Sequence, residues 1–352
     1  MSPAIVQFSR VCIQRQLYRS AKNLYIRTMS TSDKPKVYVT RRIPESGLVL
    51  LREKCDISQW SSDDPVPRAE LLANLKDKDA LFCLLTDKVD KEVLDAGKQL
   101  KVIGTMSVGY DHLDLPEIAK RSIPVGYTPD VLTDATAELT VSLLLAASRR
   151  IPEGVDAVRS GEWGTWKPMW LCGATLVGST VGIIGLGRIG LAVAKRLQPF
   201  GVSQFLYTGT SQKPYESEIN AQFLDFNSLL EKSDFVVVCC ALTAETKNLF
   251  NENAFRRMKK SAIFVNTSRG GVVDQDALCN ALATGEIRAA GLDVTVPEPL
   301  PTDSPLLKLN NCVVIPHIGS ATDETRSRMA ELTAQNIIAG LEGRPMPAQI
   351  KV

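Results

Sequence analysis

One glycine-rich stretch, residues 181–197, constrains the fold of this 352-residue chain more than any other. It opens with an apolar run typical of a buried strand and continues with apolar residues at helical spacing. Between the two stands G-x-G-x-x-G, formed by Gly185, Gly187 and Gly190. In a dinucleotide-binding domain these glycines allow a tight turn, a close approach to the pyrophosphate and close helix–strand packing. The alternative is a glycine-rich turn without a ligand, but the flanking strand and helix favour a nucleotide site.

Strands and helices alternate along most of the chain, which predicts parallel sheets covered by helices on both faces. We expect strands at residues 36–40, 80–85, 100–105 and 123–126, and after the glycine-rich stretch at 205–208, 235–240, 262–266, 289–294 and 312–316. A helix over 133–150 should link the two groups, and a last helix over 322–341 should return to the first.

The expected fold class is α/β, with two Rossmann-like doubly wound domains. The larger, a dinucleotide-binding domain, should be inserted in a flavodoxin-like substrate domain. The expected divisions are a leader over 1–33, a substrate-binding domain over 34–130 and 318–352, and an NAD(P)-binding domain over 131–317.

Composition argues against several other classes of protein. The net charge of +2 gives no sign of a nucleic-acid partner. No apolar run approaches the roughly 18 residues of a membrane-spanning helix, so we expect no membrane span. Eight cysteines are scattered without a C-x-x-C pair, which favours a reduced compartment and no metal site.

Residues 1–32 differ from the rest, because they contain no acidic residue before Asp33. Their basic residues are Arg10, Arg15, Arg19, Lys22 and Arg27. A basic, serine-containing and acid-free N-terminus is typical of a mitochondrial transit peptide, although a disordered basic tail is the alternative. A second start at Met29 would give a cytoplasmic form without the leader.

Three polar residues follow predicted strands in the second half, where the reactive end of a bound coenzyme should lie. Arg269 can bind a carboxylate with two parallel hydrogen bonds. His317 can donate a proton to a carbonyl oxygen, and Glu298 can orient and charge the imidazole. Each residue alone has a structural explanation, as a salt bridge, a loop carboxylate or a strand-end cap. Together, beside a nucleotide loop, they indicate a catalytic site.

Two further segments suggest roles in binding. The loop 107–112 directly follows a predicted strand, so the backbone N–H groups of Val108 and Gly109 can hold a small anion. In the same loop, His112 is expected to support the loop structure more than catalysis. Residues 161–170 hold three of the four tryptophans. They favour a subunit interface, with packing against their own domain as the alternative.

The residues after the second strand of the nucleotide half bear on the coenzyme. An NAD site usually places a carboxylate there for the ribose 2′-hydroxyl, but residues 207–213 contain none. Thr210 and Gly209 leave room, Ser211 can donate a hydrogen bond, and Lys213 and Arg188 can supply positive charge. The sequence therefore predicts NADP, with NAD as the alternative.

These motifs together resemble the D-2-hydroxyacid dehydrogenase family, in its glyoxylate reductase/hydroxypyruvate reductase branch. The segments that carry the resemblance are 185–190, 266–270, 291–299 and 316–321, with 108–112 and 166–173 specific to the branch. The resemblance covers residues 36–352. It departs from the family at Gly209 and Thr210, where NAD users have an acidic residue and NADP users a neighbouring basic one.

The resemblance implies a reductase that converts glyoxylate to glycolate and hydroxypyruvate to D-glycerate with hydride from NADPH. It implies a catalytic triad of Arg269, Glu298 and His317, with His317 as the acid. Implied substrate contacts are Val108, Gly109, Arg269, His317 and, from a partner subunit of a homodimer, Trp166. Expected coenzyme contacts are Gly185, Gly187, Arg188, Ile189, Gly190, Thr210, Ser211, Lys213, Thr267, Arg269, Asp293 and Gly319.

The alternatives lie within the same family. One is an NAD(H)-binding corepressor-like protein, which the absence of an acidic ribose-binding residue and the mitochondria-like leader disfavour. The others are different D-2-hydroxyacid dehydrogenases. Phosphoglycerate dehydrogenase is disfavoured because no regulatory domain is appended, and formate dehydrogenase because Glu298 stands where such relatives carry glutamine.

Overall fold

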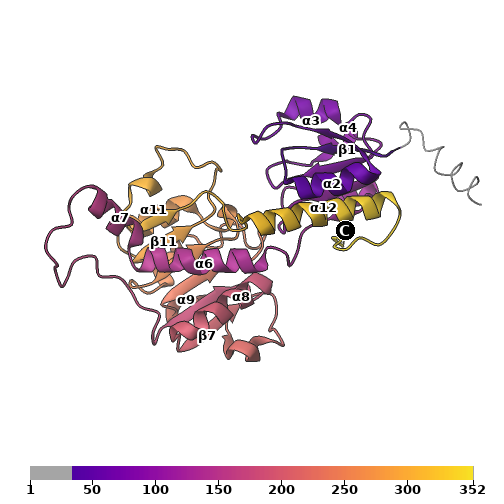
Figure 1. Ribbon diagram of the computed structural model, residues 1–352. Coiled ribbons are helices and arrows are strands. Elements are labelled where there is room, and N and C mark those ends of the chain that lie inside the picture. Colours follow the sequence, from indigo (N-terminus) through magenta and orange to yellow (C-terminus); the bar gives the residue numbers. More distant parts are fainter. Residues whose placement is uncertain (1–33, 352) are drawn as a thin grey trace, which may run out of the picture.

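A computed structural model describes residues 34–351, and its strands form two separate parallel sheets flanked by helices (Figure 1). The two predicted α/β domains are therefore confirmed. The predicted leader and the second start at Met29 lie outside the described residues. Within residues 34–351, no helix combines the length and the apolar character needed to cross a bilayer.

The first sheet has five strands in the order β2-β1-β3-β4-β5, which is the flavodoxin-like order. Its strands are β1 (Lys36–Val39), β2 (Asp56–Gln59), β3 (Ala80–Cys83), β4 (Val102–Thr105) and β5 (Val125–Gly126). The helices between them are α2 (Glu45–Lys54), α3 (Arg68–Asn74), α4 (Lys91–Ala96) and α5 (Leu115–Lys120). The edge strand β2 was not expected from the sequence, because DISQ lacks the apolar run of a buried strand.

The second sheet has seven strands, with β6 in its interior and the order β8-β7-β6-β9-β10-β11-β12. They are β6 (Thr180–Ile184), β7 (Gln204–Thr208), β8 (Ala221–Phe223), β9 (Phe235–Val238), β10 (Ile263–Asn266), β11 (Ala289–Leu292) and β12 (Cys312–Val314). The chain leaves β6 first toward one edge and later returns to build the other. The glycine turn after β6 therefore lies at the topological switch point, where ligands bind in such sheets.

Helices cover both faces of this second sheet. The long helices beside it are α6 (Thr133–Ser148), α8 (Arg188–Leu197) and α11 (Gln275–Ala283), with the shorter α9 (Phe226–Lys232) and α10 (Glu252–Arg257). Single turns of 3-10 helix are η1 (Gln198–Phe200), η2 (Glu216–Ile219), η3 (Gly270–Val272) and η4 (Pro305–Lys308). Alternate residues of the central strands enter two different cores, as Ile183 and Ile184 do, so the sheet is buried on both faces.

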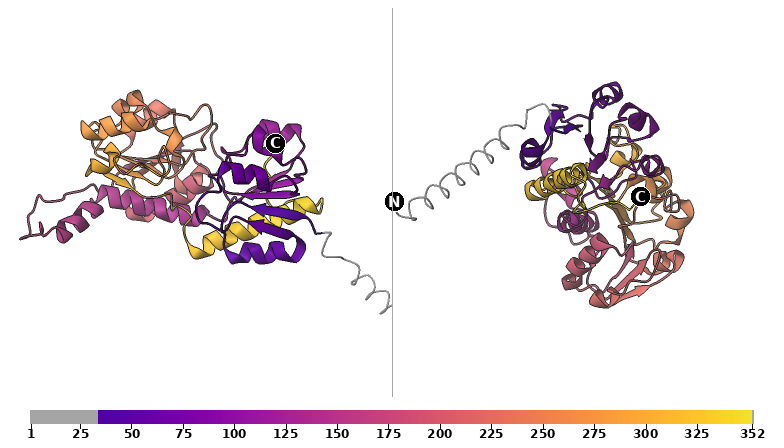
Figure 2. Two further views of the ribbon diagram at one scale, coloured as in Figure 1. Left: turned by 90° about the horizontal axis from the view of Figure 1, so that it is seen from above. Right: turned by 90° about the vertical axis from the view of Figure 1, so that its right-hand side faces the viewer.

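The last helix, α12 (Asp323–Leu341), returns to the first sheet, as the sequence predicts (Figure 2). It crosses α2 so closely that a Cβ at Gly47 would lie 2.9 Å from the Cβ of Ala330. Buried Asn336 donates to the Tyr127 carbonyl and accepts from the Ala348 N–H, each over 2.9 Å. The domain boundaries after residues 130 and 317 remain predictions. The strands of the first sheet all precede residue 130, and those of the second sheet all follow it.

A projecting element follows α6. Residues 160–175, which follow helix α7 (Ile151–Arg159), are here called the arm. Helix α7 and the arm extend from the second domain on the side away from the first sheet (Figures 1 and 2). The arm contains turns and no strand or long helix. Its large apolar side chains include Trp163, Trp166 and Met169, which are 65%, 82% and 84% exposed.

Candidate active site

A cavity of about 820 Å³ lies between the two domains. Residues 106–111 line it from the first domain, while residues 239–244, residues 267–269 and His317 line it from the second. These segments follow the carboxyl ends of β4, β9, β10 and β12. A cavity at this edge of two parallel sheets is the expected position for a small ligand and a nucleotide.

The glycine turn between β6 and α8 has the geometry of a nucleotide-binding loop. Gly185 has a φ of +93°, and a Cβ there would lie 2.9 Å from the backbone of Cys240. A Cβ at Gly190 would lie 2.4 Å from the carbonyl oxygen of Gly185. At Gly187 a Cβ would meet nothing within 4 Å, so the backbone is open on the side where phosphates would approach. Helix α8 begins at Arg188 and directs its free N–H groups to this point.

The loop after β7 lies at the position expected for the adenosine ribose. Lys213 Nζ donates to Ser211 Oγ over 3.1 Å; Ser211 is exposed and Lys213 is half-buried. The nearby Glu216 carboxylate accepts from Tyr207 and Gln212. The predicted contact Thr210 lies in the same exposed segment.

His317 and Glu298 form a close pair. Nδ1 of His317 lies 2.8 Å from Oε2 of Glu298, and Oε1 of Glu298 accepts from the Thr295 N–H over 3.0 Å. Burial opposes ionisation of Glu298, but the hydrogen bond and charge of His317 outweigh it and lower the carboxyl pKa. Because an ionised carboxylate only accepts, Nδ1 carries the donated proton and Nε2 is left for a ligand. His317 lines the cavity.

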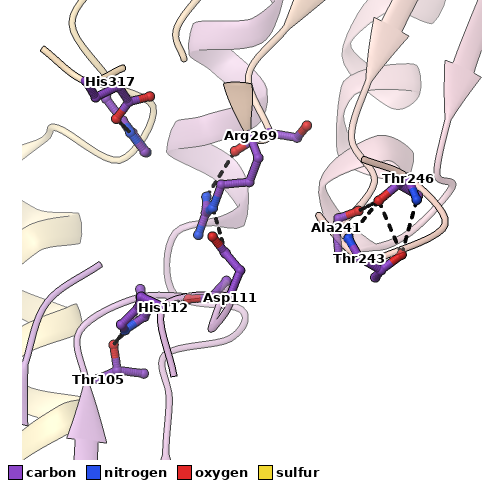
Figure 3. A network of polar contacts seen from close by, with 12 residues as sticks. Thr105, Asp111, His112, Ala241, Thr243, Thr246, Arg269 and His317 are labelled. Atoms are coloured by element: carbon purple, nitrogen blue, oxygen red, sulfur yellow. Dashed lines mark hydrogen bonds and ion pairs between the residues drawn. The ribbon is translucent and has the colours of Figure 1, made fainter. Parts of the chain in front are cut away.

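Arg269 crosses the cavity to the other domain (Figure 3). Its Nε donates to Oδ1 of Asp111 over 2.9 Å, and its Nη1 donates to the Ser268 carbonyl over 3.0 Å. The remaining nitrogen, Nη2, lies over Gly109, where an added Cβ would be only 2.0 Å away. The guanidinium is therefore held by two fixed contacts, with one edge facing the loop predicted to bind a carboxylate.

The loop 107–112 is fixed from within. Ser107 Oγ donates to the Gly109 carbonyl over 2.7 Å and lies 2.8 Å from Thr105 Oγ1, which lies 3.0 Å from His112 Nε2. Burial lowers the pKa of His112 to about 4, so its ring is neutral. Within residues 34–351 the N–H groups of Val108 and Gly109 donate to no other group. The loop thus presents two free donors at the cavity.

Asp293 and Thr267 lie at the end of the site where the resemblance places the nicotinamide. The buried Asp293 carboxylate accepts from the N–H groups of Ile318 and Gly319 over 2.7 and 2.8 Å. Burial raises its pKa. Thr267 Oγ1 lies 2.7 Å from Thr140 Oγ1 of α6. The Asp293 contacts fix the segment that carries His317 to the end of β11, and the Thr267 contact fixes the end of β10 to α6.

The structure brings most of the predicted site residues together. Those that line the cavity are Val108, Gly109, Ile189, Thr267, Arg269, Asp293, His317 and Gly319. Glu298 lies behind His317, and the three glycines and Arg188 form the adjoining turn. Trp166 does not line the cavity of its own chain, because it lies on the exposed arm. Among residues 34–351, no three histidine, cysteine or acidic side chains are grouped to hold a metal.

Sequence reasoning did not single out Asp111, which the structure places in contact with the predicted site residue Arg269. It lies in the loop already singled out, but its contact with Arg269 spans 158 residues of sequence. The only signal in the sequence was an acidic residue three positions after Val108, opposite an expected arginine.

Residues 141–319 match the model of the D-isomer specific 2-hydroxyacid dehydrogenase NAD-binding domain. The human and mouse glyoxylate reductase/hydroxypyruvate reductases are 58% and 54% identical to the chain, over 90% of it and 98% of each relative. The glyoxylate reductase of Thermofilum pendens is 53% identical over 90% of the chain and 94% of the relative.

Solved structures agree with these sequence relatives. A protein from Thermus thermophilus superposes with a TM-score of 0.83 at 44% identity, over 90% of the chain and 100% of that structure. An NADPH-dependent glyoxylate/hydroxypyruvate reductase from Sinorhizobium meliloti, in complex with NADP and malonate, gives a TM-score of 0.80 at 30% identity, over 90% and 97%. From the matched domain, the relatives and the site, this chain belongs to the D-2-hydroxyacid dehydrogenase family of NAD(P)-dependent oxidoreductases.

Proposed function

We propose that this enzyme reduces glyoxylate to glycolate and hydroxypyruvate to D-glycerate, with NADPH as the hydride donor. The observation that carries the proposal is the His317–Glu298 pair, with Nδ1 2.8 Å from the carboxylate, in the same cavity as Arg269 and the loop 107–111. The identity of 58% to the human glyoxylate reductase/hydroxypyruvate reductase supports the choice of substrates.

Different residues of the cavity bind the substrate and transfer the proton. The N–H groups of Val108 and Gly109 and the free edge of Arg269 would bind the carboxylate of the keto acid, which fixes its carbonyl in the cavity. A nicotinamide bound beyond the glycine turn would supply the hydride. His317 donates the Nε2 proton to the carbonyl oxygen as the alcohol forms, and Glu298 stabilises the charged ring before that transfer. A proton from solvent then restores His317.

NADPH is proposed over NADH because of the loop after β7. Residues 209–213 contain no carboxylate, and Ser211 and Lys213 form a polar pair. The Glu216 carboxylate is already engaged by Tyr207 and Gln212. A 2′-phosphate would therefore meet a hydroxyl and an ammonium group, with which it can form charge-assisted hydrogen bonds.

Steady-state oxidation of NADPH and NADH by the full chain, with glyoxylate and with hydroxypyruvate, tests both parts. We expect turnover with both keto acids and a lower KM for NADPH than for NADH. A lower KM for NADH would refute the coenzyme choice alone. No turnover with either keto acid would refute the proposed reaction.

We also propose that the enzyme is a homodimer held by the arm and α7. Three apolar residues of α7 are exposed, in addition to the arm side chains already described: Ile151, Val155 and Val158. A second copy would cover them, and Trp166 would then reach the partner's cavity. Sedimentation equilibrium should give twice the 38.4 kDa of one chain. A monomer at micromolar concentration would contradict the proposal.

Finally, we propose that residues 1–33 direct the enzyme to mitochondria and that a form starting at Met29 stays in the cytoplasm. The basic, acid-free composition of residues 1–32 supports import. Fractionation of cells and N-terminal sequencing of each native form test this. Full-length protein in the cytoplasm alone would contradict it.

A further inference from the structure

Arg188 and Asp130 meet beside the glycine turn, where the two domains join. Arg188 is the first residue of α8, and its Nε lies 2.5 Å from Oδ1 of Asp130. Asp130 belongs to the crossover from β5 to α6 and has a φ of +70°. The two side chains are 62% and 64% exposed, so a ligand at the turn can reach the guanidinium.

In this ion pair Asp130 binds the guanidinium that the pyrophosphate of a nucleotide would need. The coenzyme pyrophosphate is expected at the N-terminus of α8, where Gly187 leaves the backbone open. Arg188 starts from this same point. A phosphate and a carboxylate bind a guanidinium through the same charge-assisted hydrogen bonds, so they compete for it.

We propose that Asp130 is an internal competitor of the coenzyme. Its carboxylate holds Arg188 before the nucleotide binds, and the enzyme must break this ion pair to bring Arg188 to the pyrophosphate. Asp130 therefore lowers coenzyme affinity through its ion pair with Arg188. The inference rests on the proposed use of a nicotinamide coenzyme, but not on the choice between NADPH and NADH, since both carry the pyrophosphate.

The size of the effect follows from the exposure of the pair. Exposed ion pairs contribute little, so removing Asp130 should tighten coenzyme binding about two- to fivefold, the equivalent of about 0.4–1 kcal/mol. Salt screens exposed charges, and the difference should shrink at high ionic strength.

The experiment measures dissociation constants by fluorescence titration of the full chain with NADPH and with NADH, at low and high salt and without keto acid. The test variant is Asp130→Asn, because asparagine tolerates a positive φ. Should that variant not fold, Asp130→Gly replaces it, since glycine adopts this φ freely. The matched control is Asp134→Asn, which breaks the ion pair of 2.8 Å with Arg196 at the far end of α8.

We expect Asp130→Asn to lower both dissociation constants by a similar factor and Asp134→Asn to leave them unchanged. In an Arg188→Ala background, Asp130→Asn should have no effect. Unchanged or weaker binding by Asp130→Asn would overturn the inference, as would equal tightening in the Arg188→Ala background. Tighter binding in an enzyme that reduces neither keto acid would support this inference and contradict the proposed reaction.

Discussion

Replacing His112 with glutamine should change how the stability of the enzyme depends on pH. The His112 ring is partly buried and hydrogen-bonded to Thr105, and burial lowers its pKa from 6.5 to about 4. In the unfolded chain His112 therefore binds a proton near pH 6.5, whereas in the folded chain it binds one only near pH 4. Between these values the unfolded state holds more protons, so this histidine destabilises the fold as the pH falls.

The magnitude follows from the two pKa values. At pH 5.0 the unfolded histidine is almost fully protonated and the folded one almost neutral. Linkage then gives a loss of about 2 kcal/mol relative to pH 7.5, at about 1.4 kcal/mol per pH unit. His112→Gln cannot show this loss. At pH 7.5 it should cost about 1 kcal/mol, because the bond to Thr105 is perturbed.

The assay is urea unfolding of the full chain and of His112→Gln at pH 7.5 and 5.0, at one protein concentration. Other titrating groups are common to both proteins, so the difference between their pH dependences isolates His112. We expect the unsubstituted enzyme to lose about 2 kcal/mol more than the variant on acidification. Equal losses would refute the argument that burial keeps His112 neutral.

Three further substitutions test the site. Glu298→Gln should lower kcat about 10²-fold or more and leave KM for the keto acid within a few fold, because the neutral amide no longer stabilises charged His317; unchanged kcat would contradict its role. Asp111→Asn should raise KM for glyoxylate about three- to tenfold with a smaller effect on kcat, since Arg269 loses a charged partner; a fall in kcat alone would contradict a positioning role. Gly109→Ala should lower kcat/KM by more than about 10²-fold, because its Cβ would lie 2.0 Å from Nη2 of Arg269. Steady-state kinetics at saturating NADPH measures the effect of each of the three substitutions.

Much of the fold was predictable because its signals are local. The apolar strands and the glycines at 185, 187 and 190 each have one physical reason that does not depend on distant residues. The strands β2 and β8 were missed because DISQ and AQF carry no apolar run, and both lie at sheet edges where such a run is not required. Helix α7 was missed because the sequence from 151 to 159 contains proline and glycine.

The site was predictable as a set of residue types at strand ends, but not as a set of contacts. His317, Glu298 and Arg269 follow strands whose carboxyl ends meet at one edge of a sheet. The pairs Asp111–Arg269 and Asp130–Arg188 join segments far apart in the sequence, and their geometry depends on how the two domains sit across the cavity. No local pattern could have paired these charges.

The role of His317 as the proton donor is tested by comparing glyoxylate-dependent oxidation of NADPH by the full chain and by His317→Ala. We expect turnover by the unsubstituted enzyme and a kcat about 10²–10⁴-fold lower in the variant, the usual contribution of a general acid. Glyoxylate-dependent turnover that is unchanged in His317→Ala would contradict the assignment of the proton donor, and so the mechanism proposed for this site.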